Sequence, residues 1–425
     1  MWTKLLLFIG IILPFLVFSQ EDKARRITEV LCSDSLYGRG YLHNGVNKAA
    51  DFLKDEFQKS GLQPYFGDTS YFQSFSFGVN TFPHKVELKS KDRVLTPGKD
   101  FLIDPSSGGF KGDLDLVLID STILYDEGYR NTKLNEVLNG DKNGFYVDFD
   151  SSPVQNEGHL TFQLNQLSAI GPLVYVSNQK LMWAVGREQF KNPVFYVKPG
   201  LLSFDEDISA EVDAKMISHF ESRNVAGYLP AKKQTKNTKT IVFTAHYDHL
   251  GGMGTEVSTY FPGANDNASG TAMLVSMADY FVENPSEYNM LFIAFAGEEA
   301  GLLGSEYFVE HTEIDLSDIK FLLNLDIMGS GEEGITAVNG RIHKEEFELL
   351  ESINAEKEYL TKVKARGETR NSDHYHFHLK NVPSFFIYTM GPNKNYHDIY
   401  DTYDELTFSA YNNIIHLIAD FVKEL

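Results

Sequence analysis

Residues 294–305 read Ala-Phe-Ala-Gly-Glu-Glu-Ala-Gly-Leu-Leu-Gly-Ser. They join the apolar run 290–295 to a segment, 302–308, whose apolar residues suit a short helix, so Glu298 and Glu299 fall at a strand-to-helix turn. Open α/β sheets place their functional residues at such turns. Two adjacent carboxylates at the end of a buried strand repel each other unless a cation or a proton neutralises them. We therefore interpret this pair as half of a metal site.

Four apolar runs have the length of buried strands, and each leads to a side chain of a metal-ligating type. These runs are 241–245 before His246, 290–295 before Glu298, 321–325 before Asp326 and 383–388 before His397. Helices are expected between them, at 268–283 and 344–356, and an amphipathic helix closes the chain within residues 406–425. The pattern predicts an α/β fold with a mixed central β-sheet flanked by helices.

Residues 80–221 have a different texture, because short apolar runs there are separated by Gly, Pro, Asp and Asn. We interpret this segment as a smaller, mostly β domain inserted into the main domain, which comprises residues 20–79 and 222–425. The first part of the main domain is expected to be helical over 21–61, with an edge strand at 71–77. The insert contains no cluster of ligand-type residues, so its expected role is that of a lid or spacer.

The first nineteen residues carry one lysine and the apolar run 5–18, which Gly10 and Pro14 interrupt. The run is too short and too interrupted to span a membrane comfortably, so a cleaved signal peptide is favoured over an anchor. Cleavage is expected near Ser19-Gln20. The sequence therefore predicts export to a periplasm or to the exterior, without stable membrane insertion of the mature chain.

The chain of 425 residues has a formal net charge of -21, and its one cysteine is Cys32. Such a charge repels phosphates, so nucleic-acid binding is disfavoured, whereas cations are concentrated near the surface. A single cysteine forms no internal disulfide bond. Neither the charge nor the cysteine count indicates an oligomeric state.

A set of two histidines and three carboxylates is expected to converge at one edge of the sheet, beside Glu298: His246, Asp266, Glu299, Asp326 and His397. Each of them alone has an ordinary explanation as a cap, a turn residue or a hydrogen-bonded side chain. Together they match two zinc ions that share one bridging carboxylate, since calcium or magnesium has little use for two histidines. One glutamate is then left for proton transfer.

Five stretches resemble the aminopeptidase Y/aminopeptidase S family of zinc exopeptidases in clan MH. They are 246–251 (His-Tyr-Asp-His-Leu-Gly), 263–270 (Gly-Ala-Asn-Asp-Asn-Ala-Ser-Gly), 296–301 (Ala-Gly-Glu-Glu-Ala-Gly), 324–329 (Asn-Leu-Asp-Ile-Met-Gly) and Tyr396-His397. The resemblance is strong from residue 224 to the end and weaker at 36–40 (Leu-Tyr-Gly-Arg-Gly). The insert occupies the position where many members carry a protease-associated domain, although its own sequence resembles that module only faintly.

The resemblance implies that His246 and Asp326 hold one zinc, that Glu299 and His397 hold the other, and that Asp266 bridges them. It makes Glu298 the general base that takes a proton from metal-bound water and returns it to the leaving amine. Asp248 would orient the imidazole of His246. Tyr396 would hydrogen-bond the tetrahedral oxyanion, although an aromatic ring that merely packs over the loop is the alternative.

Residues 370–374 (Arg-Asn-Ser-Asp-His) resemble a segment near the substrate in this family, which makes Arg370 and Asp373 candidate substrate-binding residues. On a helix, His374 and His378 lie four residues apart, which suits a third metal, but a capped surface helix is favoured. After His397 the chain lacks the Thr-Pro that the family often has before Asp-Thr, so the shape of this loop is left open.

The leading functional hypothesis is an exported two-zinc exopeptidase that removes N-terminal residues from peptides. A glutaminyl cyclase is the first alternative, and a carboxypeptidase or dipeptidase, for which Arg370 is the nearest hint, is another. A non-catalytic ectodomain that uses the fold for binding is a third alternative. It is disfavoured because all the ligands and the base are present.

Overall fold

The computed structural model describes residues 20–67, 69–91, 93–149, 157–254 and 259–425. The expected signal peptide, residues 1–19, lies outside the described residues, so its cleavage and the export of the chain stay predictions. Across the described ranges, no helix combines the length and the apolar composition that crossing a bilayer requires.

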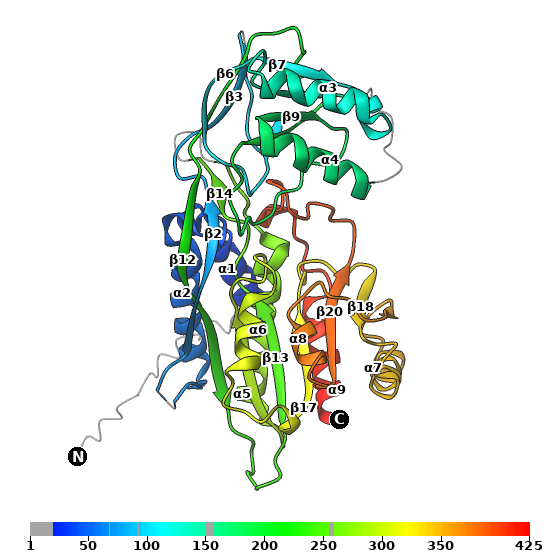
Figure 1. Ribbon diagram of the computed structural model, residues 1–425. Coiled ribbons are helices and arrows are strands. Elements are labelled where there is room, and N and C mark those ends of the chain that lie inside the picture. Colours follow the sequence, from blue (N-terminus) through cyan, green and yellow to red (C-terminus); the bar gives the residue numbers. More distant parts are fainter. Residues whose placement is uncertain (1–19, 68, 92, 150–156, 255–258) are drawn as a thin grey trace, which may run out of the picture.

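A nine-stranded mixed sheet forms the lower domain in Figure 1. Eight strands follow one path, in the order β1 (Gln63–Pro64), β12 (Lys215–Leu229), β16 (Asn289–Phe295), β13 (Thr240–His246), β17 (Ile319–Leu325), β20 (Ser384–Met390), β18 (Gly334–Val338) and β19 (Val363–Ala365). The ninth, β2 (Phe72–Thr81), pairs with β12 antiparallel. The four central strands β16, β13, β17 and β20 are parallel.

Helices cover both faces of this sheet, because alternate side chains of its central strands point into two separate apolar clusters. One face packs against α1 (Gln20–Leu31), α2 (Gly45–Ser60), α5 (Gly270–Glu283), α7 (Lys344–Lys357) and α9 (Tyr411–Glu424). The other packs against α6 (Leu303–Glu310) and α8 (His374–His378). The mixed sheet flanked by helices confirms the predicted fold class, and all four predicted strands are present.

The prediction of helix over residues 21–61 is wrong in the middle of that segment. The chain breaks between α1 and α2 into short 3-10 turns, Asp34–Arg39 and Leu42–Asn44. Tyr37, Gly38 and Arg39 all have positive φ, between 44° and 62°. This left-handed path turns the Arg39 side chain into the protein, where it is completely buried. Burial of one arginine, and not helix propensity, therefore sets the backbone here.

The described residues of the inserted domain form two sheets and two α-helices. One sheet has the order β5 (Phe101–Ile103), β10 (Val194–Val197), β9 (Leu173–Val176), β8 (Gly144–Val147) and β7 (Leu116–Ile119). The other has the order β4 (Arg93–Val94), β3 (Val86–Ser90), β11 (Ile208–Val212) and β6 (Phe110–Leu114). Helices α3 (Glu127–Leu138) and α4 (Glu157–Ile170) cover the first sheet, so this domain is less purely β than the sequence indicates.

The strands β2 and β12 form a long ribbon that rises from the lower domain into the inserted domain (Figure 1). Thr81 at the end of β2 pairs with Lys215 at the start of β12. The boundary expected at residue 221 therefore lies within β12. The two domains also share an apolar cluster, in which Leu250, Met253 and Phe261 of the lower domain pack against the insert. The insert is thus attached by a ribbon and by a common core.

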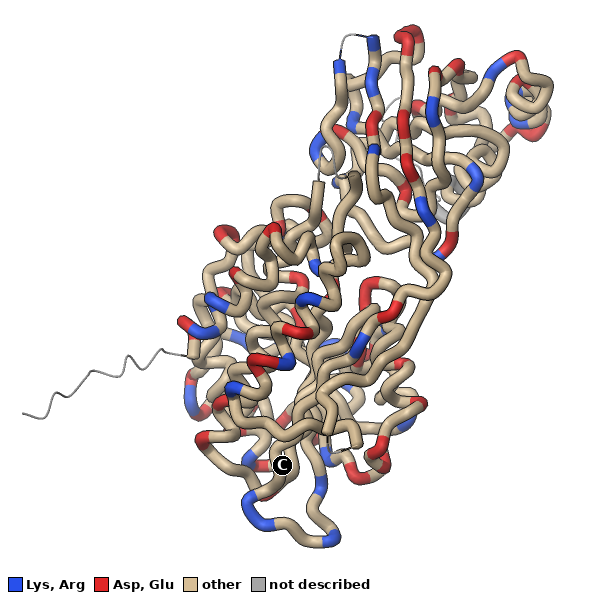
Figure 2. Tube along the Cα trace, turned by 90° about the vertical axis from the view of Figure 1, so that its left-hand side faces the viewer, with Lys and Arg blue, Asp and Glu red and all other residues tan. Residues whose placement is uncertain are grey.

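Charged residues are spread over both domains. Figure 2 shows acidic positions interspersed with lysine and arginine positions in both domains of the described chain. The negative net charge of the chain is therefore distributed over the molecule.

Candidate metal centre

The candidate ligands lie where the central parallel strands end. Strand β13 has β16 on one side and β17 on the other, and the connections to those strands carry α5 and α6 on opposite faces of the sheet. In open α/β sheets a crevice forms at such a reversal of strand order, outside the carboxyl ends of the strands. His246 ends β13 and Asp326 follows β17 directly, so both lie at this position.

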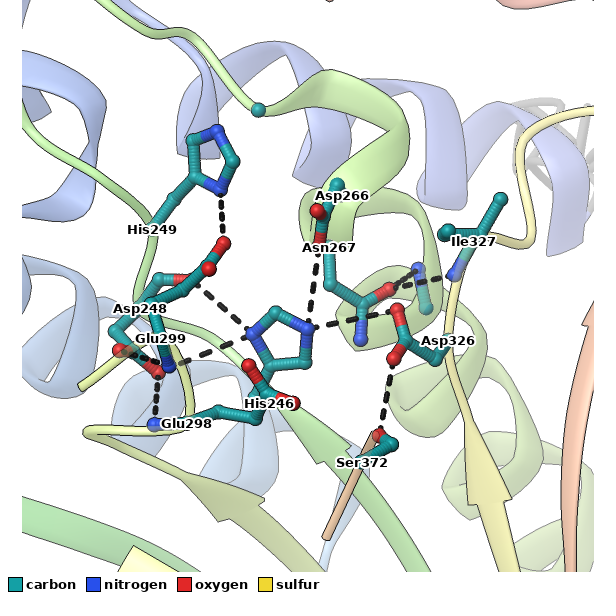
Figure 3. Close-up of polar contacts among 12 residues, drawn as sticks. His246, Asp248, His249, Asp266, Asn267, Glu298, Glu299, Asp326, Ile327 and Ser372 are labelled. Carbon is teal, nitrogen blue, oxygen red and sulfur yellow. Dashed lines mark hydrogen bonds and ion pairs between the residues drawn. The ribbon is translucent and has the colours of Figure 1, made fainter. Parts of the chain in front are cut away.

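His246 occupies the middle of the site (Figure 3). Its Nε2 atom lies 3.3 Å from Oδ1 of Asp266 and 3.4 Å from Oδ1 of Asp326. On the other side of the ring, Nδ1 lies 3.3 Å from the backbone oxygen of Asp248. The side chain is 2% exposed. One imidazole nitrogen therefore points at two carboxylates, and a carbonyl holds the other.

His397 faces the second half of the site. Its Nε2 atom lies 3.2 Å from Oδ2 of Asp266 and 3.1 Å from Oε2 of Glu299. The other oxygen of Glu299, Oε1, lies 2.7 Å from Nδ1 of His249, a histidine that is completely buried. The two carboxylate oxygens of Asp266 thus face different histidines, one in each half of the site.

The turn with Glu298 and Glu299 is anchored by Asp248. The backbone N–H groups of Glu298 and Glu299 donate to the two carboxylate oxygens of Asp248, at 3.2 and 3.4 Å. Oδ1 of Asp248 lies 3.9 Å from Nδ1 of His246, too far for a hydrogen bond, so in this geometry the backbone carbonyl of Asp248 orients the ring. Burial raises the pKa of Asp248 to about 7.

The loop that carries Asp266 is held from two directions. Asp401 accepts hydrogen bonds from the backbone N–H groups of Asn265 and Asp266. From the other side, the buried guanidinium of Arg39 donates all five of its N–H groups to backbone oxygens: Leu31, Tyr247, Pro262, Gly263 and Asp266. Arg39 therefore ties the end of β13 to the loop of the expected bridging ligand.

The same loop fixes the segment after β17. Side chains of Asn265, Asn267 and Ser269 accept hydrogen bonds from the backbone N–H groups of Gly329, Ile327 and Met328. Beside them, Ser372 donates to Oδ2 of Asp326 at 3.0 Å. The polar residues of stretch 263–270 thus have a structural explanation, because they hold the expected ligands Asp266 and Asp326 at a fixed separation.

The donor set fits a pair of borderline divalent cations. Three overlapping groups of ligand atoms lie within 4.8 Å of one another: His246, Asp266 and Asp326; His246, Glu298 and Glu299; and His249, Asp266 and Glu299. The buried atoms Oδ1 of Asp326 and Nε2 of His397 have no hydrogen-bond partner. Buried nitrogen and oxygen atoms that converge without hydrogen bonds are what zinc binds.

Electrostatics inside the site lead to the same conclusion. Burial lowers the pKa of His397, but the charges of Glu299 and Asp266 outweigh it and raise the pKa to about 11. Burial and the charges of Glu299, Asp373 and Asp326 raise the pKa of Glu298 well above its usual value. The clustered carboxylates therefore stabilise bound positive charge, and in the absence of metal ions this charge is supplied by protons on the histidines and carboxylates.

The remaining predicted site residues lie at different distances from this cluster. The ring of Tyr396 stacks on His397, with 3.8 Å between centroids and 13° between planes, and is 49% exposed. Asp373 is completely buried, and neither carboxylate oxygen has a hydrogen-bond partner. Arg370 is exposed, with its guanidinium 5.6 Å from the ring of Tyr375. The structure thus brings Tyr396 to the cluster and leaves Arg370 outside it.

The pair His374 and His378 lies on α8, as expected, but His374 is buried and not on the surface. Nε2 of His378 contacts Glu368 at 3.2 Å. Among the described residues, neither histidine belongs to a group of three metal-ligating side chains. A third metal at this helix is therefore not supported.

Three residues of the site were not identified from the sequence. His249 lies in the stretch 246–251 that was singled out, so its position beside His246 was a signal. Arg39 lies in the stretch 36–40, but only its left-handed backbone and complete burial show its role. Trp183 belongs to the insert, and its backbone oxygen lies 3.1 Å from Nδ1 of His397. No motif marked that contact.

The model of peptidase family M28 matches residues 224–422, the part of the chain that contains the whole cluster. This domain belongs to peptidase family M28. The chain is similar to aminopeptidase YwaD of Bacillus subtilis (strain 168), with 36% identity over 127 residues. That alignment covers 29% of this chain and 26% of YwaD, so the chain spans about a quarter of this relative.

A probable leucine aminopeptidase of Trichophyton verrucosum is 28% identical over 224 residues, which cover 50% of this chain and 58% of that protein. Among solved structures, a zinc aminopeptidase from Bacillus subtilis, BSAP, has a TM-score of 0.70 at 19% identity and covers 96% of this chain and 95% of its own. An aminopeptidase from Aneurinibacillus sp. strain AM-1 has a TM-score of 0.62 at 18% identity, with 95% and 93% coverage. The shared fold therefore includes the inserted domain as well as the M28 domain.

Proposed function

We propose that the chain is an exported zinc-dependent exopeptidase that hydrolyses the N-terminal peptide bond of peptides at a two-zinc site. One observation carries the two-metal assignment: Oδ1 of Asp266 faces His246 while Oδ2 faces His397. A carboxylate that presents one oxygen to each histidine has the arrangement of a bridging ligand. His246 and Asp326 would then hold one zinc, and Glu299 and His397 the other.

Bound zinc supplies Lewis acidity, which polarises the scissile carbonyl and makes water a better nucleophile. The protein supplies the proton transfer, with the carboxylate of Glu298 taking a proton from the attacking water and passing it to the leaving amine. The hydroxyl of Tyr396 remains protonated, because partial burial of this half-exposed side chain and the charges of Asp266 and Glu299 raise its pKa, and can therefore donate to the developing oxyanion.

The preference for free N-termini is supported by the charge of the site. The carboxylates of Glu298 and Asp326 lie at the sheet edge where the scissile bond of a substrate would bind. Their negative charge would attract the ammonium group of a free N-terminus. The similarity to YwaD and to a fungal probable leucine aminopeptidase supports the same substrate class.

A peptide panel tests this function. The zinc-loaded protein should release N-terminal residues from free peptides and leave N-acetylated peptides intact, and a chelator should abolish the activity. Glu298→Gln should lower kcat by roughly 10²- to 10⁴-fold, since it removes the base and preserves the shape. Glu310→Gln is the matched control, because Glu310 is exposed at the end of α6.

Three outcomes contradict the proposal. Cyclisation of glutaminyl peptides without release of residues would establish the cyclase alternative. Release of C-terminal residues from acetylated peptides would establish a carboxypeptidase. A protein that binds zinc but neither cleaves nor cyclises any peptide of the panel would support a binding role.

Export is tested separately, by N-terminal sequencing of the protein recovered from the producing cells. A mature chain that begins at Gln20 and is found outside the cytoplasm is expected. Recovery of the intact N-terminus from the cytoplasm would contradict this part of the proposal.

A further inference from the structure

The loop that carries His397 lies at the junction of the two domains, beneath the insert (Figure 1). His397 has a positive φ of 58°, a conformation that costs a non-glycine residue about 1 kcal/mol or more. The residue is nevertheless fixed, because two hydrogen bonds join it to Trp183 of the insert. Nδ1 of His397 lies 3.1 Å from the oxygen of Trp183, and N–H of Trp183 donates to the oxygen of His397 at 3.0 Å.

This contact decides which nitrogen of His397 is available to a metal. A carbonyl oxygen only accepts hydrogen bonds, so Nδ1 must carry the proton. In the neutral imidazole, Nε2 is then the nitrogen with a free electron pair, and it faces Glu299 and Asp266. The carbonyl of Trp183 thus selects the tautomer that a zinc ligand requires and holds the plane of the ring.

A second attachment comes from Lys180 of the insert. Its ammonium group donates to the backbone oxygens of Lys394 at 2.6 Å and Tyr396 at 2.9 Å, and it pairs with Oδ2 of Asp398 at 2.8 Å. All three N–H donors of the lysine are therefore directed at one loop, on both sides of His397. The side chain of Asp398 is 8% exposed, so without Lys180 a nearly buried carboxylate would lose its cation.

Trp183 is itself held rigidly in place. Its indole Nε1–H donates to the oxygen of Ile103 at 2.8 Å, and its ring stacks on Phe261 of the M28 domain at 5.0 Å. The residue is 6% exposed. The indole therefore lies between the two domains, and its backbone carbonyl has a fixed position relative to the metal cluster.

We propose that the inserted domain is a positioning element of the metal centre: the carbonyl of Trp183 and the ammonium of Lys180 hold His397 and Tyr396, so zinc binding and docking of the insert are coupled. The proposal rests on the zinc site of the proposed function. It assigns the insert a role beyond that of a lid or spacer. Since coupling is reciprocal, zinc at His397 also tightens the contact between the domains.

The variant Lys180→Met tests this coupling, because it keeps the apolar stem and removes the three donors. Lys142→Met is the matched control, since Lys142 lies in the same domain and forms an exposed ion pair with Asp115. Zinc affinity and stoichiometry are measured by competition with a chromophoric chelator. Lys180→Met should lower the affinity for one of the two zinc ions by roughly tenfold or more and leave the affinity for the other unchanged. Loss of a group that holds a metal ligand in place typically has an effect of this size. Lys142→Met should leave both unchanged.

Tryptophan fluorescence supplies a second readout. The chain has two tryptophans, Trp2 and Trp183, and Trp2 lies in the expected signal peptide, so in a protein that begins at Gln20 Trp183 is the only indole. Its emission should change with the zinc equivalent that Lys180→Met weakens. Asp398→Asn, which keeps the acceptor for Tyr400 N–H but loses the ion pair, should weaken the same equivalent by a smaller factor.

The outcomes separate this proposal from the proposed function. If the protein binds two zinc ions and cuts peptides, but Lys180→Met and Lys142→Met have the same zinc affinities, the coupling is refuted and the function stands. Emission of Trp183 that does not respond to zinc would also refute it. Failure of the unmodified protein to bind zinc at all would overturn both.

Discussion

Replacement of Arg39 by lysine should destabilise the protein more than any exposed arginine replacement. The guanidinium donates five hydrogen bonds to backbone oxygens at 2.7 to 3.3 Å, and the side chain is completely buried. An ammonium group has three donors, so at least two buried carbonyls lose their partner. Each hydrogen bond from a charged group contributes about 1.5–3 kcal/mol, which places the cost at about 3–6 kcal/mol.

This cost is a large part of the total stability of a domain, which is about 5–15 kcal/mol. It is therefore measurable as a change in the free energy of unfolding, by urea unfolding followed by circular dichroism. Arg366→Lys is the matched control, since Arg366 is exposed and its guanidinium donates to the hydroxyl of Tyr388 at 3.4 Å on the surface. Its cost should stay below about 1 kcal/mol. A difference between the two variants smaller than about 1 kcal/mol would refute the reasoning that Arg39 ties β13 to the Asp266 loop.

Three further predictions follow from the site and its surroundings. Zinc affinity should rise with pH, because His397 must release its proton to bind the metal, and Glu299 and Asp266 raise its pKa to about 11 against the effect of burial. Calorimetry in two buffers of different ionisation enthalpy should show about one proton released per imidazole. A pH-independent affinity would contradict this prediction. Tyr396→Phe should lower kcat by roughly 10²- to 10³-fold with unchanged zinc content, because the ring stack on His397 persists while the hydroxyl is lost; unchanged kcat would establish the packing role. Cys32, which is 8% exposed and whose pKa burial raises to about 11, should react with iodoacetamide at least roughly tenfold more slowly in the native than in the unfolded protein, and equal rates would contradict its burial.

Much of the M28 domain could be predicted because its signals are local and strong. Each central strand is buried on both faces and therefore reads as a continuous apolar run, and two of these runs lead directly to His246 and Asp326. The parallel arrangement then brings His246 and Asp326 together without further information, because the carboxyl ends of parallel strands share one edge.

The parts that the sequence concealed depend on contacts between distant segments. Helix α3 has no buried residue, so its periodicity is weak, and only the cap of Asp126 on N–H of Tyr129 marks its start. The break between α1 and α2 exists because Arg39 reaches carbonyls more than two hundred positions away. The contact from Trp183 to His397 spans a similar separation and uses a backbone carbonyl, which leaves no trace in side-chain patterns.

The ribbon of β2 and β12 has a consequence for the history of the chain. Thr81 and Lys215 lie opposite each other, so a short hairpin loop between them would close the M28 domain without displacing any other strand. The strand pairing of the main sheet therefore does not require residues 82–214, and this segment forms a cassette that could be removed or exchanged without disrupting that pairing. The cassette is not free to vary, however, because any replacement must present an acceptor to His397 and a cation to Asp398 at the same place.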